Sequence, residues 1–527
     1  MISISTWAWL FGCILRPSQL FTMARITDLP NEVLLMIVKR LLPDDIESAT
    51  LACGAVYRAS QRILEQHRRL KDEFEFYRAM NVGEGRTLID LAIRVVLEPE
   101  VAFYIKKLEL CAKFSQKLAD DKEAFNRISS NIKLFATRRE LRQWRGSFLE
   151  GQNEGFVPMF LLILPNLKEM RLGPASTCYE IFKPTIHRDP RPDLVKMRIS
   201  NLEHVYVGND SQAGGHRLDL ITTFARLSSV HSIEATRVIE TEGYWRMPEP
   251  CSLELRTLKL RNCQIPPKIM FDFLRAFKAL QKFSSDAKSV DDDIGEIACP
   301  HENDGSGGFI EPYWARLALE LFAKDTLERL TLRSRSLKSA DMGDITSFPR
   351  LQYLNTEIST LFPRVRRTTS GGYWYLAALL PPSIEHVRLH NISRDKRVQA
   401  SLLALGLLET KTERVPFLKM LELFSFEGVA AFEKENDWCG PSYEDLQAQC
   451  EDIGFSFTVT AYKASASSSL KSEHDGEIGN EWNRWKHLTV IWWSKDSARG
   501  PPKKYWSRED CMWVLYWGVC GPWGWGG

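Results

Sequence analysis

The chain has 527 residues, with 69 lysines and arginines against 67 aspartates and glutamates, so its formal net charge is only +2. A charge so close to neutrality argues against a nucleic-acid or membrane-surface protein in which the whole chain forms a basic footprint. Hydrophobic residues make up 44% and charged residues 26%, which is typical of globular proteins, and the length allows roughly three domains. The 31 glycines and 25 prolines exclude a collagen-like or low-complexity chain.

The 11 cysteines are scattered from Cys13 to Cys520, and no CxxC pair occurs among them. That spacing excludes zinc-ribbon, RING and thioredoxin-type sites, and a chain this long needs no disulfides to hold a core. Cys299-Pro300-His301-Glu302 has metal-binding residue types, but no second pair stands near it, so we expect a plain loop there. We predict reduced cysteines of a cytoplasmic or nuclear protein, with no bound metal and no cofactor.

No run of apolar residues reaches the roughly 18 that are needed to cross a bilayer. The longest candidate, Trp7 to Leu15, is short and lacks the preceding basic residue of a secretory signal. Residues 1–22 are therefore either a poor signal peptide or a dispensable extension that folds with nothing. We favour the extension, because Met23 stands just before the first strongly patterned segment.

That segment, residues 25–80, predicts a compact helical unit. Pro30 suits the first turn of a helix, and Glu32 places negative charge near the helix N-terminus. The six apolar residues from Val33 to Val38 cover the whole circumference of this helix, whereas a surface helix carries a single apolar stripe. Because so small a unit can bury only one side of its first helix, the pattern implies contact with another protein.

Two further helices are expected, one after Pro43 and one over residues 56–70. The second of these has an apolar face that includes His67 and an opposite face rich in arginine. We expect His67 to pack in a core rather than bind a ligand, and the arginine-rich face to be solvated.

These residues resemble an F-box, the segment through which adaptor proteins bind Skp. The match runs over Leu29-Pro30-Asn31-Glu32-Val33-Leu34, Ile37, Leu41-Leu42-Pro43-Asp44-Asp45-Ile46, Ala52-Cys53 and Tyr57. Residues 97–110 and 144–172 also look like filamentous-fungal members of that family. The resemblance implies an F-box over residues 25–75, with three helices. It also implies a set of Skp-binding residues: Leu29, Pro30, Val33, Ile37, Leu41, Leu42, Pro43 and Ile46.

A loose self-similarity follows, in which apolar residues alternate with the period of a short strand. The units are Leu167-x-x-Met170-x-Leu172, Leu202-x-x-Val205-x-Val207, Leu255-x-x-Leu258-x-Leu260, Leu327-x-x-Leu330-x-Leu332, Ile384-x-x-Val387-x-Leu389 and Leu418-x-x-Leu421-x-Leu423, with weaker copies from Leu227, Leu280 and Leu351. Starts at 202, 227, 255 and 280 are 25, 28 and 25 residues apart, as in leucine-rich repeats. Apolar stretches such as residues 269–277 can supply returning helices.

We favour an irregular leucine-rich-repeat-like region over residues 88–460, whose curved surface would hold a substrate. The alternative is an ordinary α/β domain whose strands happen to contain Leu-x-Leu. Residues 81–86 have the composition of a connector, and residues 288–310 that of a solvated loop. A Ser-rich linker is expected over residues 461–476. The last segment, residues 477–527, holds nine of the 16 tryptophans and could be either a recognition surface or a small packed unit.

The predicted fold class is therefore α+β or an α/β solenoid, with an N-terminal three-helix F-box followed by an irregular leucine-rich-repeat-like region. We find no Walker A, GxSxG, HExxH or strand-linked GxGxxG motif, so we do not expect an enzyme. The resemblance implies a substrate adaptor that binds Skp, and through it a cullin of an SCF ubiquitin ligase, together with an unidentified substrate protein, but no nucleic acid or membrane. The alternatives are a Skp-binding scaffold that never recruits cullin and an enzyme with an unrecognised site.

Overall fold

A computed structural model describes the chain from residue 29 to residue 461, with gaps. The described residues are 29–79, 88–110, 130, 142, 160, 163–173, 201–208, 217–240, 248–286, 310–333, 342–361, 376–390, 406–408, 410–425 and 443–461. Several predictions concern other residues: the dispensable extension 1–22, the connector 81–86, the loop over 288–309, the linker beyond residue 461 and the tryptophan-rich segment 477–527 all lie outside these ranges.

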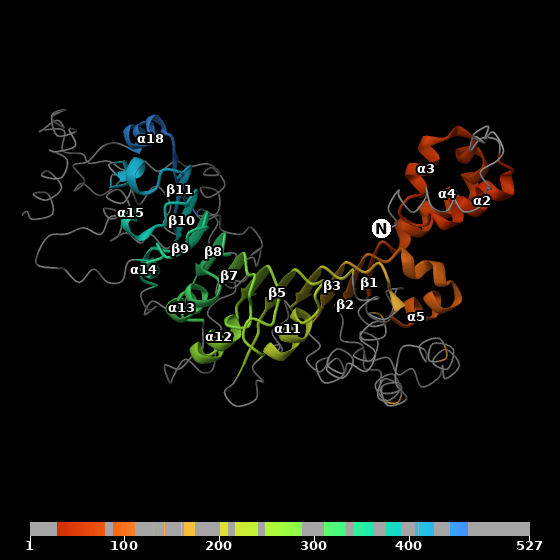
Figure 1. The fold of residues 1–527 in the computed structure, drawn as a ribbon, viewed down its shortest axis with the longest axis horizontal. Coiled ribbons are helices and arrows are strands. Elements are labelled where there is room, and N and C mark those ends of the chain that lie inside the picture. Colours follow the sequence, from red (N-terminus) through yellow and green to blue (C-terminus); the bar gives the residue numbers. More distant parts are fainter. Residues whose placement is uncertain are drawn as a thin grey trace, which may run out of the picture.

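One sheet runs along the molecule, and within the described residues it has twelve strands in the order of the chain, each parallel to its neighbours. Figure 1 shows the strands succeeding one another from the N-terminal helices to α18 at the opposite end. The strands are β1 (Phe76–Ala79), β2 (Lys107–Leu110), β3 (Glu169–Leu172), β4 (His204–Val207), β5 (Ser232–Thr236), β6 (Thr257–Arg261), β7 (Lys282–Asp286), β8 (Arg329–Arg333), β9 (Tyr353–Glu357), β10 (His386–His390), β11 (Met420–Ser425) and β12 (Ser456–Ala461).

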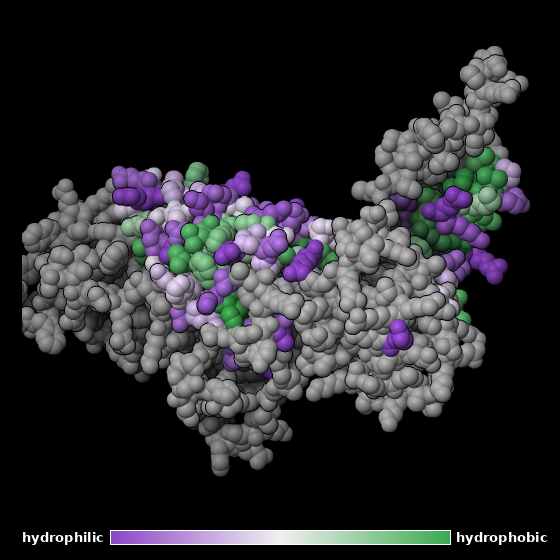
Figure 2. Space-filling view, turned by 60° about the horizontal axis from the view of Figure 1, so that its bottom comes forward, coloured by the Kyte–Doolittle hydropathy of each residue, from purple (hydrophilic) through white to green (hydrophobic). Residues whose placement is uncertain are grey.

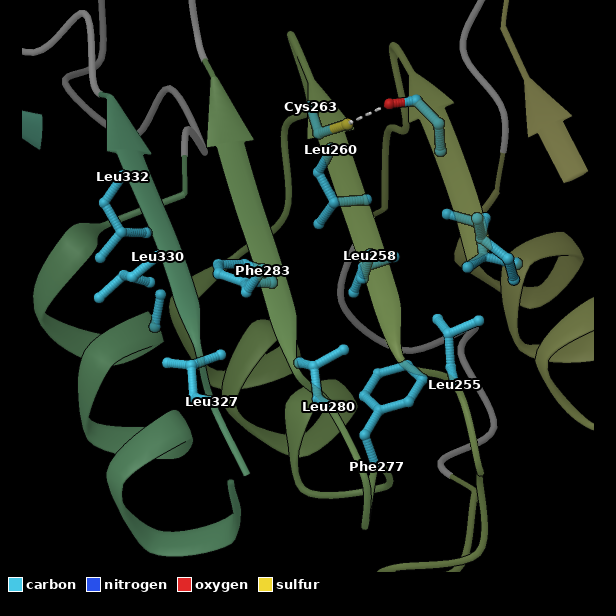
Figure 3. Close-up of a cluster of buried hydrophobic side chains, with 14 of the residues drawn as sticks. Leu255, Leu258, Leu260, Cys263, Phe277, Leu280, Phe283, Leu327, Leu330 and Leu332 are labelled. Atoms are coloured by element: carbon cyan, nitrogen blue, oxygen red, sulfur yellow. Dashed lines mark hydrogen bonds between the residues drawn. The ribbon is translucent and has the colours of Figure 1, made fainter. Parts of the chain in front are cut away.

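The core lies behind this sheet, because alternate strand residues are apolar and point to one side. Leu258 is opposite Phe283, and Phe283 is opposite Leu330, so that buried side chains of successive strands form a continuous ladder. Figure 3 shows this ladder across β6, β7 and β8, together with leucines from the turns that precede these strands. The intervening strand residues, such as Lys259 and Arg329, are exposed. One face of the sheet therefore builds the core and the other is polar.

Helices return the chain between the strands, and α11 (Leu218–Ala225), α12 (Pro267–Leu274) and α13 (Pro312–Phe322) lie on the same side of the sheet in Figure 1. Both α12 and α13 start with proline, whose missing N–H costs nothing in the first turn. The sequence places the returning helix of residues 269–277 correctly, since α12 begins only two residues earlier. The remaining helices of this region are α14 (Ile358–Leu361), α15 (Leu376–Leu379) and α18 (Tyr443–Asp452).

The turn after β6 illustrates how the strands are held at their ends. Asn262 has a φ of 51°, a left-handed conformation that asparagine tolerates better than most residues. The next residue, Cys263, is buried; its sulfur accepts the Val238 N–H at 3.4 Å and donates to the Ala235 carbonyl at 3.8 Å. Figure 3 marks the second of these bonds, which joins the ends of β5 and β6.

Three helices precede the sheet: α2 (Asn31–Arg40), α3 (Ile46–Ala52) and α4 (Gly54–Phe74). They share a small buried cluster made of Leu34, Val38, Ile46, Val56 and Leu64. The helix α4, however, continues into the main core, which begins with Leu70 and Phe74 and goes on to Tyr77 of β1. Leu42, between α2 and α3, packs against both clusters.

These observations correct the predicted fold class. The fold is α/β, built on one uninterrupted, all-parallel sheet, and not α+β with an independent three-helix F-box and an irregular repeat region. The helices do not close into a unit of their own, because the last turns of α4 are buried in the core of the sheet and β1 follows at Phe76. The physical reason is that α4 has more apolar surface along its length than α2 and α3 can cover. The alternative of an α/β domain is the one that agrees with the structure.

The strands themselves lie where the alternation predicts them, since β3 to β11 coincide with the nine apolar units. Three strands were not predicted. Phe76–Ala79 falls inside the predicted helical unit, and it is recognisable as a strand only because it pairs with β2. The other two carry a local signal outside the nine units: Ile105-x-x-Leu108-x-Leu110 has the same apolar spacing, and in Ser456–Ala461 the apolar Phe457 and Val459 alternate with polar residues. The region also contains α5 (Leu88–Leu97) and a 3-10 helix, η2 (Pro99–Phe103), between β1 and β2.

Candidate protein-binding surfaces

The helix α2 exposes apolar side chains that its own fold does not bury. Leu34 and Val38 face the helical cluster, whereas Val33 is 37% exposed and Met36 is 63% exposed. Val33 and Met36 are three residues apart and so share one face of the helix. The six apolar residues in a row therefore divide between two sides, one packed inside the chain and one open to a partner.

The neighbouring helices extend this apolar surface. Leu51 on α3 is 87% exposed and Tyr57 on α4 is 43% exposed, which is unusual for such large side chains. Figure 2 shows hydrophobic residues at the surface of these N-terminal helices, beside strongly hydrophilic ones. Exposed Lys39 and Arg40 end α2 and add positive charge beside the apolar residues.

The structure distributes the eight residues that the resemblance assigns to Skp binding over three environments. Pro30 and Val33 are exposed, and Ile46 is fully buried in the helical cluster. The others are partly buried: Leu29, Ile37, Leu41, Leu42 and Pro43. Ile46 therefore holds the helices together in the free chain, while Met36, Leu51 and Tyr57 expose apolar surface that the resemblance did not include among these residues.

A polar junction fixes the helices to the start of the sheet. His67 of α4 is 2% exposed, as expected for a packed histidine; its Nδ1 lies 3.2 Å from the Tyr104 hydroxyl and its Nε2 lies 3.5 Å from a Glu47 carboxylate oxygen. Lys71 Nζ contacts the other Glu47 oxygen at 3.2 Å. Lys106, next to β2, contacts Asp44 at 3.2 Å. The helices are thus held by residues from both sides of the junction.

We expect this junction to make the stability of the protein depend on pH. Burial lowers the pKa of His67 below its ordinary 6.5, although the Glu47 carboxylate acts in the opposite direction. Below pH 6.5 the histidine of the unfolded chain takes up a proton, whereas His67 of the folded chain stays neutral until a lower pH. The free energy of unfolding therefore has its full value above pH 6.5 and decreases as the pH falls toward the folded-state pKa of His67. The loss is at most about 1.4 kcal/mol per pH unit in that window.

Urea denaturation at pH 7.5, 6.5 and 5.5 measures this effect. The His67→Gln variant, which cannot take up the proton, should lose less stability on acidification than the parent. A matched control is His204→Gln, since His204 lies on β4 with its side chain 57% exposed, and its replacement should leave the pH dependence as it is. The same acid-dependent loss in the His67→Gln variant and the parent would contradict the assignment.

The polar face of the sheet forms a second surface, in which charges of neighbouring strands are paired. We call it the open face. On its first half Arg78 contacts Glu109 at 3.4 Å, and Glu169 contacts both Lys107 at 3.1 Å and Arg171 at 2.8 Å. Burial is the largest single influence on the pKa of the Glu169 carboxyl and raises it. The hydrogen bonds and charges of Arg171 and Lys107 together outweigh burial, so the pKa lies below its ordinary value.

The pairing continues on β5 and β6, where Glu234 contacts Lys259 at 3.4 Å and Arg261 at 3.0 Å. Further along, Arg333 contacts Asp286 at 3.1 Å, and Arg388 pairs with Glu422.

Between these pairs, β7 and β8 carry two cations side by side. Lys282 and Arg329 are direct partners in the parallel register, and both are exposed. Among the residues that the structure describes, no carboxylate oxygen is within ion-pair distance of either one. Arg329 instead places its guanidinium carbon 5.6 Å from the centre of the Tyr353 ring, and Arg388 lies at the same distance from that ring.

The described residues contain no group of three or more histidine, cysteine, aspartate or glutamate side chains that could hold a metal ion. Burial raises the pKa of the Cys263 and Cys450 thiols to about 12 in each case, which leaves both protonated and poorly nucleophilic at neutral pH. Within the same residues, no helix is long and apolar enough to cross a membrane.

Comparison with known proteins gives no family assignment. No protein-family model matches the chain, and no curated protein matches it at a significant level. Two surfaces therefore bear on the function of the chain, the helical one around Met36 and the open face of the sheet. The apolar run of residues 33–38 indicates the first surface. For the second, the sequence predicts a curved substrate-binding surface over residues 88–460 but not the residues that form it, because the facing side chains come from strands far apart in the chain.

Proposed function

We propose that the chain is a substrate adaptor, which binds a Skp-type protein through its N-terminal helices and holds a second protein on its sheet. Through Skp it would join that second protein to a cullin-based ubiquitin ligase, in the cytoplasm or the nucleus. The observation that carries the proposal is the apolar face of α2, with Val33 and Met36 exposed beside Pro30. The resemblance of Leu29 to Tyr57 to the F-box motif supports the choice of Skp as the partner.

Leaving this apolar face in water is unfavourable, and a partner that covers it removes that cost. Burying a side chain of this kind contributes about 1.5–3 kcal/mol, so each such contact changes the affinity by roughly ten- to a hundredfold. Pro30 restricts the backbone just before α2, so the chain loses little conformational freedom when a partner covers Leu29 and Val33.

The position of α4 in both buried clusters also favours an adaptor. Because α4 is packed both in the helical cluster and in the core of the sheet, the helices cannot swing freely relative to the strands. A protein bound on the open face would therefore be kept at a fixed place relative to Skp. In such an arrangement the adaptor contributes proximity, which raises the effective concentration of the target, and the transfer chemistry belongs to the ligase partners. We assign no catalytic step to this chain.

Isothermal titration calorimetry of the full chain with purified Skp tests the proposal. The Val33→Asp/Met36→Asp variant places two charges on the exposed face and should lose Skp binding by at least about a hundredfold, because each buried charge leaves an unpaired, desolvated group. A matched control is Leu321→Asp on α13, where the side chain is 59% exposed on a distant helix, and its affinity for Skp should equal that of the parent.

Two outcomes decide between the proposal and its alternatives. Absence of Skp binding by the parent chain, or equal binding by the Val33→Asp/Met36→Asp variant, would refute it. A pull-down with Skp and cullin together then separates an adaptor from a scaffold: the adaptor retains cullin through Skp, whereas a scaffold retains Skp alone.

A further inference from the structure

The cations of the open face are not equally satisfied, and the exception lies on β7 and β8. Several strands of the sheet supply carboxylates to neighbouring lysines and arginines: β3 through Glu169, β5 through Glu234, β7 through Asp286 and β11 through Glu422. Lys282 and Arg329 stand opposite each other with no such partner in the described part of the chain. Like charges on directly opposite strand residues repel each other and are unfavourable for the sheet. Lys282 and Arg329 thus form a local excess of positive charge, which an anionic partner would neutralise.

The surroundings of the two cations complete a site for an anion. Neighbouring strands lie about 4.8 Å apart, so the two side chains can reach one carboxylate or two adjacent ones. The next residues on the same face of β7 and β8 are Ser284 and Thr331, which are paired in register and offer hydroxyl donors. The ring of Tyr353 holds the Arg329 guanidinium in a cation–π contact and so reduces its freedom before binding.

We propose that Lys282 and Arg329 bind an acidic segment of the protein that the open face holds, with the carboxylates of the segment contacting both cations. This inference rests on the proposed function, because it specifies the chemistry of the second protein. Within the described strands, the unpaired positive charge is confined to β7 and β8, because Glu234 on β5, Asp286 at the end of β7 and Glu422 on β11 pair with the other cations. So small a cationic site fits a short acidic segment of a protein better than the continuous row of phosphates of a nucleic acid.

Fluorescence anisotropy of the full chain with a labelled glutamate-rich peptide measures this binding, and a glutamine-rich peptide of the same length is the reference probe. The parent should bind the glutamate-rich peptide, more weakly at high salt. The Lys282→Gln/Arg329→Gln variant should lose about tenfold in affinity, since two exposed ion pairs each contribute a few-fold. The control is Lys107→Gln/Arg171→Gln on β2 and β3, which removes the same charge from cations already paired with Glu169 and should change the affinity by less than about twofold.

Three results would overturn the inference. The first is that the parent shows no preference for the glutamate-rich peptide, and the second is an equal loss of peptide affinity in the Lys282→Gln/Arg329→Gln and Lys107→Gln/Arg171→Gln variants. The third is that the parent binds a duplex DNA or RNA probe more tightly than the peptide and that the Lys282→Gln/Arg329→Gln variant no longer binds this probe. Titration of the same variants with Skp keeps the two proposals apart. A failure of the peptide experiment with intact Skp binding refutes only the acidic-segment site, whereas a failure of Skp binding with the expected peptide results refutes only the Skp-dependent part of the adaptor function.

Discussion

Replacing Phe283 by alanine should lower the free energy of unfolding by about 3–5 kcal/mol. Phe283 is 1% exposed and stands in the middle of the buried ladder, with Leu258 opposite it on β6 and Leu330 opposite it on β8. Truncation removes apolar surface from the core and leaves a cavity that flanking strands cannot close, because their backbones are fixed by hydrogen bonds on both sides. We expect no loss of strand order, only a lower midpoint in urea.

The measurement is urea denaturation followed by circular dichroism. The matched control is Thr257→Ala, which truncates a partly buried side chain at the start of β6 and should change stability by no more than about 0.5 kcal/mol. Comparable losses in the two variants would mean that the ladder does not form the core of the sheet.

The second large effect concerns the helical cluster. Leu64 is 3% exposed and packs on α4 with Leu34, Val38, Ile46 and Val56. The Leu64→Ala change should destabilise this cluster by about 2–5 kcal/mol, because it removes a fully packed side chain from the contact of α4 with α2 and α3. Since Leu70 and Phe74 anchor the end of α4 in the other cluster, we expect the loss to be local to the first half of the helix.

Hydrogen exchange separates a local loss from a global one. Amides of α2 and α3 should exchange faster in the Leu64→Ala variant, whereas amides of β5 to β8 should keep the protection of the parent. Leu51→Ala is the control, as Leu51 is 87% exposed on α3 and its truncation should leave exchange in both regions unchanged. Equally faster exchange in helices and strands would show that the two clusters unfold as one.

The helix α4 and its polar junction hold the two surfaces at a fixed distance from each other. A separate helical unit on a connector would leave the apolar face of α2 and the sheet free to move apart. Instead they are joined by α4, which packs in both buried clusters, and by the junction of His67, Tyr104 and Glu47. The proposed adaptor therefore depends on a rigid path from Met36 to the open face. Loosening the junction should weaken substrate positioning without touching either surface.

The sequence alone determined the elements whose signal is local. Alternation of apolar residues located β3 to β11, since each strand buries its own leucines or valines with a period of two. The run from Val33 to Val38 indicated a helix with apolar residues on more than one side, and the exposed Met36 agrees with it.

Tertiary structure alone decided everything that depends on residues distant in the chain. Phe76–Ala79 is a strand because of its neighbour β2, and no local pattern distinguishes it. His67 and Tyr104 are 37 residues apart, yet their contact joins helices to sheet and overturns a separate three-helix unit. Likewise, Lys282 and Arg329 become one cationic site only through parallel register, because hydrogen bonding between strands, and not spacing along the chain, determines which side chains lie side by side.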